Sequence, residues 1–396
     1  MDEPIRVYLD SSDFSKFSEL QKQSSEYKDT FEYLIKKRDE GLITICFSEA
    51  HVIEAAPTSP AAIPAAIERF RTIKNLCLKN SLIHPIDVWA SESRNKINFQ
   101  EKLEIVRNDG TWLPSVVNLL EILPDVDKLV AEEIKTLTRE NRRKYLKNGK
   151  PTLKAYANMQ KFYNGNAHEL AQNLPLTPNA VKVIEQYFLG KSTRTDALNA
   201  LQVSLTDLEE FGNWYSRDWK AASDLSQHLR HAGEEFKRKL LEARTEFDLL
   251  LKERINAGDD ISKLQNLFKR TFQEALASSN NKIASGIAEK IGVSSETTDN
   301  PWNTAPGTTC SLTLAMHVAR RSILGPMPRV PSHSDFPDCY HAVYLPYVDI
   351  YRPDSFMVSV LKECNLPFPT TIVEKLLQIP AAIEKILAER AIIYCV

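Results

Sequence analysis

The sequence predicts a mixed α/β fold in which the two ends of the chain build one parallel sheet and the middle is helical. Three observations lead to this prediction. β-Branched segments at residues 5–9 and 42–47 are each followed by a segment in which apolar residues have helical spacing. Residues 95–293 keep helical spacing almost throughout, and a short strand-like segment follows at 348–351. Strands that alternate with helices are typical of a parallel sheet covered by helices.

The first predicted strand, residues 5–9, alternates apolar and polar side chains and ends at Asp10. Residues 14–37 have the period of a helix, and Gly41 is expected to end it. Residues 42–47 form the second predicted strand. The carboxylate of Asp10 is therefore expected at the carboxyl end of the first strand.

Ser48 follows the second strand and is a plausible N-cap for a short helix. Three ionisable residues lie on that helix: Glu49, His51 and Glu54. A helix at residues 65–80 and a third strand at 82–88 complete the predicted order of strand, helix, strand, helix, strand. This order predicts that the ends of the strands meet on one edge of the sheet.

The middle of the chain shows no fixed-period repeat, which disfavours a solenoid. We therefore divide the chain into residues 1–94 and 324–396, as two parts of one α/β domain, and residues 95–323, as a large all-α insertion.

The C-terminal part begins with a predicted short helix in which Asp335 has the position of an N-cap. His341 follows Asp338 on this helix after three residues, which is nearly one helical turn. A tight turn and the strand 348–351 come next, and Asp354 lies just past that strand, where it can also cap the helix 355–363. Residues 392–396 are compatible with either a last strand or a helix.

The overall composition excludes a protein that coats nucleic acid through bulk charge, because 50 Lys and Arg residues are balanced by 52 Asp and Glu residues. The six cysteines lack zinc-ligand spacing and are expected to be buried thiols in a reducing compartment. No basic and apolar leader and no apolar run of the roughly 20 residues that cross a bilayer is present, so we expect a cytoplasmic protein without a membrane partner. The GxGxxG and GxxxxGK[ST] phosphate-binding loops are absent, so a nucleotide cofactor is not expected.

Four carboxylates occupy strand ends or helix starts, namely Asp10, Glu54, Asp338 and Asp354. Residues just past the carboxyl ends of parallel strands converge on one crevice. Carboxylates gathered in this way repel one another unless cations neutralise them, and Mg²⁺ and similar ions prefer oxygen ligands. The sequence therefore predicts a divalent-metal site.

These residues carry a resemblance to a known family. Asp10-Ser-Ser after a buried strand, Val-Ile-Glu54 on a short helix, and Asp335-x-x-Asp338-x-x-His341 running on to Asp354 resemble the PIN-domain nucleases. The resemblance covers roughly residues 4–90 and 330–365. It implies a three-layer α/β/α sheet domain and cleavage of single-stranded RNA with Mg²⁺ or Mn²⁺. It implies Asp10, Glu54, Asp338 and Asp354 as metal ligands. Other residues are expected to support the ligands without binding metal: Ser12, Asp335 and His341.

One position departs from the family pattern, because Arg352 stands where many members have Thr. Arg352 would either contact a phosphate or pair with Asp354 and weaken the site. A basic and aromatic segment in the helical insertion has the composition of a surface that tracks an RNA backbone, although a solvated helical face has the same composition. The residues predicted to contact RNA are Arg142, Arg143, Lys144, Lys147, Lys150 and Arg352.

Several alternatives stay open from the sequence. Glu49 competes with Glu54 for the metal, and Asp335 and Asp338 could exchange roles. The long insertion suggests an endoribonuclease that acts when triggered, as in toxin or defence systems, with a second copy of the chain or a protein activator or inhibitor as further partners. The rival functions are a catalytically silent PIN-like scaffold that binds RNA or protein, which Arg352 favours, and a metal-dependent phosphohydrolase. The three-residue spacing of Asp10 and Asp13 does not match the Asp-x-Asp of dehalogenase-like phosphatases.

Overall fold

The computed structural model describes residues 3–94, 103–115, 123–159, 167–260, 262–264, 266–268, 270–272, 274, 301–324, 329–364 and 366–393. The strands are β1 (Ile5–Tyr8), β2 (Ile43–Cys46), β3 (Ser81–Leu82), β4 (Val106–Arg107), β5 (Leu146–Lys147), β6 (Lys150–Pro151), β7 (Ile350–Tyr351) and β8 (Thr371–Ile372). The N-terminal helices are α1 (Ser11–Ser18), η1 (Leu20–Lys22), α2 (Ser25–Asp39), α3 (Glu49–Ala55), η2 (Pro60–Ala62), α4 (Ile63–Cys77) and α5 (Pro85–Arg94).

The middle of the chain contains α7 (Val126–Thr136), α8 (Arg139–Tyr145), α9 (Leu153–Met159), α10 (Ala167–Asn173), α11 (Pro178–Phe188), α12 (Arg194–Leu205), α13 (Leu208–Arg217) and α14 (Trp219–Asn256). The C-terminal helices are α16 (Pro301–Thr304), α17 (Pro306–Ile323), α18 (Asp335–His341), η3 (Ala342–Tyr347), α19 (Ser355–Cys364), η4 (Leu376–Gln378) and α20 (Ile379–Ile393).

Four strands form one parallel sheet in the order β2-β1-β7-β8. The central strand β1 pairs with β2 on one side, with Val7 opposite Ile45, and with β7 on the other, with Val7 opposite Ile350. The start of the chain therefore supplies the middle of the sheet, and a segment near its end supplies one of the two neighbours. The prediction of a mixed α/β fold with a parallel sheet built from both ends is confirmed.

Helices cover both faces of this sheet. Successive side chains of β1 point to opposite sides of the sheet, so they pack into two different apolar clusters. Ile5 and Val7 lie in an apolar cluster with residues of α1, α2, α4, α13 and α20. Tyr8 lies in a second apolar cluster with residues of α5, α17, α18 and α19. The predicted boundary at residue 323 assigns α17 to the helical insertion, whereas in the structure α17 shares the cluster that contains Tyr8 and packs against η3.

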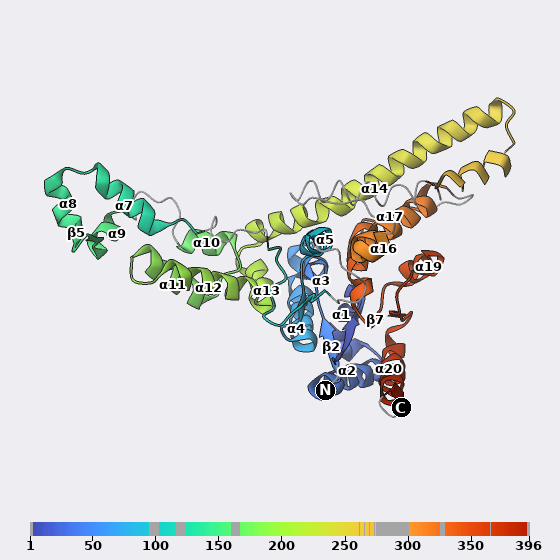
Figure 1. Cartoon of the computed structure of the whole chain (residues 1–396), viewed down its shortest axis with the longest axis horizontal. Coiled ribbons are helices and arrows are strands. Elements are labelled where there is room, and N and C mark those ends of the chain that lie inside the picture. Colours follow the sequence, from blue (N-terminus) through green and yellow to red (C-terminus); the bar gives the residue numbers. More distant parts are fainter. Residues whose placement is uncertain are drawn as a thin grey trace.

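The helices α7–α12 form an arm that extends away from the sheet and has an apolar cluster of its own (Figure 1). A two-stranded hairpin of β5 and β6 lies within it, turning through Asn148 and Gly149, both with positive φ. The helix α13 joins the arm to the sheet-bearing part, where Phe211 packs edge-on against Phe70 of α4 at 5.6 Å between ring centroids. The 38-residue helix α14 then passes over α3 and α18. Among the described helices, none combines the length and apolar character needed to cross a membrane.

The predicted third strand at residues 82–88 is wrong for most of its length. Only Ser81 and Leu82 are extended, and they pair antiparallel with β4 in a separate sheet, with one parallel bridge from Ser81 to Phe47. Residues from Pro85 onward form α5, because a proline at the first helical position has a φ angle already suited to a helix.

Other local predictions also need correction. The predicted helix at residues 14–37 is two helices, α1 and α2, with a 3₁₀ turn between them. The strand β8 was not predicted at all. Residues 392 and 393 belong to α20, while the rest of the predicted last element lies outside the described residues. The cysteine prediction is confirmed for four buried free thiols, Cys46, Cys77, Cys310 and Cys339.

Candidate functional site

Asp10 and Asp354 lie at the same edge of the sheet, since each follows the carboxyl end of one of two adjacent parallel strands, β1 and β7. Both carboxylates also cap helices. Asp10 Oδ1 accepts a hydrogen bond from the Ser12 backbone N–H at 2.7 Å, and Asp354 Oδ1 accepts one from the Met357 backbone N–H at 2.6 Å. In the described part of the chain, no donor reaches the Oδ2 atom of either residue.

Asp338 and Glu54 come to the same place from two helices in contact, α18 and α3. Burial raises the pKa of Asp338 well above its usual range, and the carboxylates of Glu54, Asp354 and Asp10 raise it further. No described residue donates a hydrogen bond to the Asp338 carboxylate. The structure thus brings the four predicted ligands, Asp10, Glu54, Asp338 and Asp354, into one cluster.

His341 holds Glu54 in this cluster. Its Nε2 lies 3.0 Å from Glu54 Oε2, and its Nδ1 lies 2.5 Å from the hydroxyl of Tyr8, which is in turn 2.6 Å from Ser48 Oγ. Burial acts to raise the pKa of Glu54, but the hydrogen bond and the charge of His341 outweigh it and the pKa is lowered. His341, expected to support a ligand, therefore contacts Glu54, because α3 lies against α18.

A second buried histidine, His51, fixes the ends of β1 and α3 relative to each other. Its Nδ1 accepts a hydrogen bond from the Ser48 backbone N–H at 3.0 Å, so Nε2 carries the proton and donates to the Leu9 carbonyl at 2.8 Å. Burial, and then the neighbouring His341, lower the pKa of His51 to about 3, which keeps the ring neutral. Sequence reasoning missed this role. The available signal was Ser48-x-x-His51, in which histidine replaces the Glu or Gln of a capping box.

Arg352 lies against the cluster as a cation. Its Nε is 3.0 Å from Asp13 Oδ2 and its Nη1 is 3.5 Å from Asp10 Oδ1, and Nη1 also donates to Ser12 Oγ at 3.4 Å. Burial raises the pKa of Asp13 to about 7, and the charge of Arg352 limits the rise. A pair with Asp354, one of the two alternatives for Arg352, is not formed; its ion pairs are with Asp10 and Asp13. Ser12, expected to support a ligand, contacts both Asp10 and Arg352.

Asp335 and Asp338 differ in their partners although they share a helix. Asp335 is fully buried, forms an ion pair with Arg329 at 2.6 Å and accepts a hydrogen bond from the Ser332 backbone N–H at 2.9 Å. The N-cap of α18 is Ser334, so the prediction that Asp335 is the N-cap is wrong. Since Asp335 is neutralised and Asp338 is not, Asp338 is the better candidate for an added cation.

The chemistry of the four carboxylates fits a divalent cation, but their present spacing does not. Asp338 is buried among like charges without a partner, and Asp10 and Asp354 each present an oxygen that receives no hydrogen bond from described residues. Asp10 and Asp338 line a hollow of about 10 Å³, enough for one water molecule. Nevertheless, no three His, Cys, Asp or Glu side chains within the described ranges are placed to hold one metal ion. Metal binding here requires the carboxylates to move toward one another.

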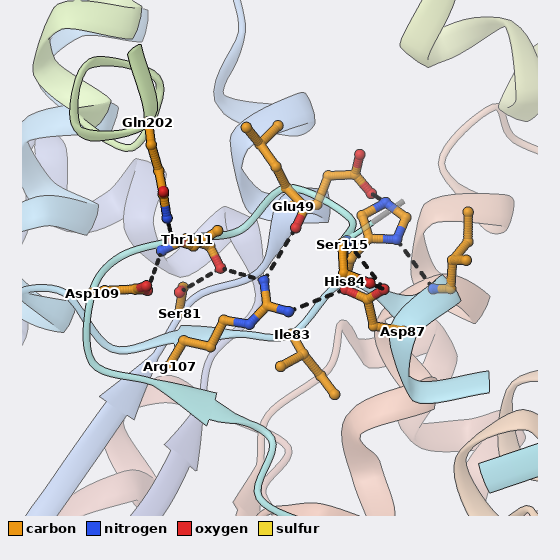
Figure 2. A network of polar contacts seen from close by, with 12 residues as sticks. Glu49, Ser81, Ile83, His84, Asp87, Arg107, Asp109, Thr111, Ser115 and Gln202 are labelled. Atoms are coloured by element: carbon orange, nitrogen blue, oxygen red, sulfur yellow. Dashed lines mark hydrogen bonds and ion pairs between the residues drawn. The ribbon is translucent and has the colours of Figure 1, made fainter. Parts of the chain in front are cut away.

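Beside the cluster lies a larger cavity of about 750 Å³, whose wall includes both Glu49 and Glu54. Glu49 Oε2 lies 2.5 Å from His84 Nε2 and accepts a hydrogen bond from the Tyr340 hydroxyl at 3.3 Å. Figure 2 shows His84 and Glu49 facing each other within a polar network that continues to Asp87. Glu49 is therefore held on the cavity wall by His84 and Tyr340, whereas Glu54 belongs to the acidic cluster.

A separate set of predicted RNA contacts lies on the arm, far from the acidic cluster (Figure 1). The exposed members are Arg142, Arg143, Lys144, Lys147 and Lys150, on α8 and the β5–β6 hairpin. The Arg142 guanidinium donates to the carbonyls of Leu137 and Lys135, both at 2.8 Å, and so caps the end of α7. The structure does not bring these residues to the acidic cluster.

Comparisons of the chain with protein-family models, with curated proteins and with solved structures found no match. The likeness to PIN-domain nucleases therefore rests on the sequence motifs, and the fold described above rests on the strand pairing.

Proposed function

We propose that the protein is a divalent-metal-dependent endoribonuclease that hydrolyses phosphodiester bonds in single-stranded RNA. The observation that carries this proposal is the convergence of four carboxylates, Asp10, Glu54, Asp338 and Asp354, one of which is buried without a partner. Such a cluster is costly unless a cation joins it. The cytoplasm, where Mg²⁺ is abundant, is the proposed compartment.

The residues would divide the work as follows. Asp338, Asp10 and Asp354 would hold Mg²⁺ or Mn²⁺, and Glu54 would be kept ionised and oriented by His341. The bound cation would neutralise the carboxylates and activate water for attack on phosphorus. His51 would position the cluster, because it ties the end of β1 to the helix that carries Glu54.

The test is cleavage of a labelled, unstructured RNA by the purified chain with Mn²⁺ or with EDTA. We expect cleavage with Mn²⁺ only, and a loss of at least about 100-fold in Asp10→Asn and Asp338→Asn, since each removes a charged ligand. The matched control is Asp39→Asn, an exposed carboxylate on α2 that pairs with Arg38. Cleavage that persists in EDTA or in both cluster variants would contradict the proposal.

A second candidate is a catalytically silent PIN-like scaffold, which the ion pairs of Arg352 with Asp10 and Asp13 favour. Arg352 already supplies positive charge at the position where a metal would approach Asp10. A folded protein that neither cleaves RNA nor gains thermal stability from Mn²⁺ would support the scaffold.

A further inference from the structure

The large cavity beside the acidic cluster has three aromatic rings in its wall. Its volume of about 750 Å³ is that of a site for a small molecule. Tyr340 of α18 stacks on Phe336 at 5.9 Å between ring centroids, and Trp89 of α5 meets Tyr340 edge-on at 6.1 Å. The indole Nε1 of Trp89 is buried, so the ring presents carbon atoms to the cavity. Rings of this kind pack against methylene groups and, through their π electrons, attract cations.

The charged groups of the wall include more carboxylates than cations. Three residues carry a carboxylate and one carries a guanidinium, in this order: Glu49, Glu54, Glu234 and Arg230. Burial lowers the pKa of Arg230, and the charges of Tyr215 and Glu54 act against this decrease. Arg230 therefore already has a counter-charge in Glu54, and two carboxylates remain for a ligand.

Glu49 keeps one oxygen for a ligand although the residue is only 9% exposed. Its Oε2 lies 2.5 Å from His84 Nε2 (Figure 2) and accepts a hydrogen bond from the Tyr340 hydroxyl. His84 Nδ1 accepts a hydrogen bond from the Ile86 backbone N–H at 3.1 Å, so His84 is a neutral imidazole that donates through Nε2. In the described part of the chain, no residue donates to Oε1 and no Lys or Arg pairs with Glu49. A buried carboxylate whose partners are neutral favours a ligand that brings a positive charge.

Glu234 of α14 supplies the second carboxylate, on an exposed part of the wall. None of the described Lys, Arg or His residues pairs with it, whereas its neighbour Glu235 pairs with Arg238 on the same helix. The cavity thus combines a buried anion, an exposed anion and aromatic rings. An aliphatic chain that carries ammonium groups has the matching parts, because its methylene groups are apolar and its nitrogens are cationic donors.

We propose that the cavity is a binding site for an aliphatic polyamine. One ammonium group lies at Oε1 of Glu49 and a second lies toward Glu234. The methylene chain lies against the rings of Trp89 and Tyr340. The site uses neither metal nor RNA, so this inference does not depend on the proposed function.

The test is calorimetric titration of the purified chain with spermidine in metal-free buffer at pH 7.5. We expect binding of one spermidine per chain, weakened at least about tenfold in Glu49→Gln, because the ammonium group loses a buried, charged acceptor. The amide oxygen of glutamine can still accept from His84 and Tyr340, and circular dichroism checks that the variant is folded. Trp89→Leu should weaken binding about threefold or more, since leucine has no π face. Butylamine, with a single ammonium group, should bind at least about tenfold more weakly than spermidine.

The matched variants are Glu234→Gln and Glu235→Gln. These neighbours lose the same charge, but only Glu234 lines the cavity. We expect Glu234→Gln to weaken binding about threefold, as for an exposed ion pair, and Glu235→Gln to weaken it less than about 1.5-fold. Equal effects of the two variants would overturn the proposal, because the amine would then respond to surface charge alone. This comparison carries the test even if Glu49→Gln fails to fold, since neither Glu234 nor Glu235 is buried.

Other outcomes also count against the site. Wild-type affinity in folded Glu49→Gln, or a wild type that does not bind spermidine, would overturn the proposal. Equal affinity for butylamine and spermidine would overturn the assignment of a second ammonium group to Glu234. Loss of binding in Asp338→Asn together with retention in Glu49→Gln would place the amine in the acidic cluster and reject the cavity.

The two proposals fail separately because the titration contains no metal and no RNA. A chain that cleaves RNA with Mn²⁺ but does not bind spermidine would retain the nuclease and reject the polyamine site. Binding of spermidine that depends on Glu49 and Glu234, in a chain that does not cleave RNA, would retain the polyamine site and reject the nuclease.

Discussion

Replacing Arg352 by methionine should destabilise the protein in EDTA, and the cost should depend on pH. The side chain of Arg352 is 7% exposed, that of Asp13 is 0% exposed and that of Asp10 is 11% exposed. The substitution therefore removes the buried cation that the two carboxylates share, and Asp13 keeps only Lys16, at 3.6 Å. Removing one partner of a buried ion pair costs about 3–5 kcal/mol, because the remaining charge stays desolvated. We expect a loss of this size in the free energy of unfolding at pH 8.5.

The pH dependence follows from Asp13. Its pKa in the folded protein is about 7, above the ordinary value of 3.8. A carboxyl whose pKa is raised by folding contributes most stability at low pH, and that contribution is lost as the pH rises through the folded pKa. At pH 5.5 Asp13 is protonated and needs Arg352 less, so Arg352→Met should cost less there than at pH 8.5.

The assay is urea unfolding followed by circular dichroism at both pH values, with Arg352→Met, Asp13→Asn and the double variant. The double variant should recover most of the loss at pH 8.5, which corresponds to a coupling energy of at least about 2 kcal/mol. A coupling energy below about 0.5 kcal/mol at pH 8.5 would refute the account of Arg352 as the cation that balances Asp13. If metal competes with Arg352, then Mn²⁺ should raise the melting temperature of Arg352→Met more than that of the wild type.

Three further predictions concern buried polar groups. His51 has a folded pKa of about 3 against an ordinary 6.5, so the wild type loses stability as the pH falls through that interval. His51→Asn should remove roughly 5 kcal/mol of this loss, measured by urea unfolding across the interval. If the free energy of unfolding depends on pH in the same way in the variant and the wild type, the prediction is contradicted. Asp338→Asn should stabilise the protein in EDTA at pH 8 by roughly 1–3 kcal/mol, because it removes an unpartnered buried charge, and it should abolish stabilisation by Mn²⁺ in thermal melts. Glu92 accepts hydrogen bonds from the Gly307 and Thr308 backbone N–H groups at 2.6 and 3.0 Å and so caps α17. Glu92→Ala should therefore lower the free energy of unfolding in urea by at least about 3 kcal/mol. A decrease below about 1 kcal/mol would show that water replaces the carboxylate.

The sequence predicted the parts of the fold that local patterns encode. The alternation of residues 5–9 and the Asp10 that follows gave β1 and its end correctly, and the segment before Asp354 gave β7. The segment 82–88 misled because a β-branched run and a helix that begins at Pro85 look alike over a few residues. The strand β8 is only two residues long and follows a Pro-rich stretch, so no periodicity could develop.

The site was predictable only where a motif carried it. The four acidic residues stood out because each lies at a strand end or on a short helix. The partners of those residues did not, because they are set by packing between distant segments. The hydrogen bond of His51 with the Leu9 carbonyl joins residues 42 positions apart, a separation that no local pattern in the sequence reveals.

The position of β1 at the centre of the sheet has a consequence for how the protein is made. Asp338 follows Glu54 by 338 − 54 = 284 residues in the sequence, and β7 cannot pair with β1 before the ribosome has delivered this stretch. At about 5–20 residues per second, the nascent chain spends roughly 15–60 s with one edge of β1 open and the acidic cluster half built. During that interval the edge of β1 that later pairs with β7 is a point at which a chaperone could hold the nascent chain.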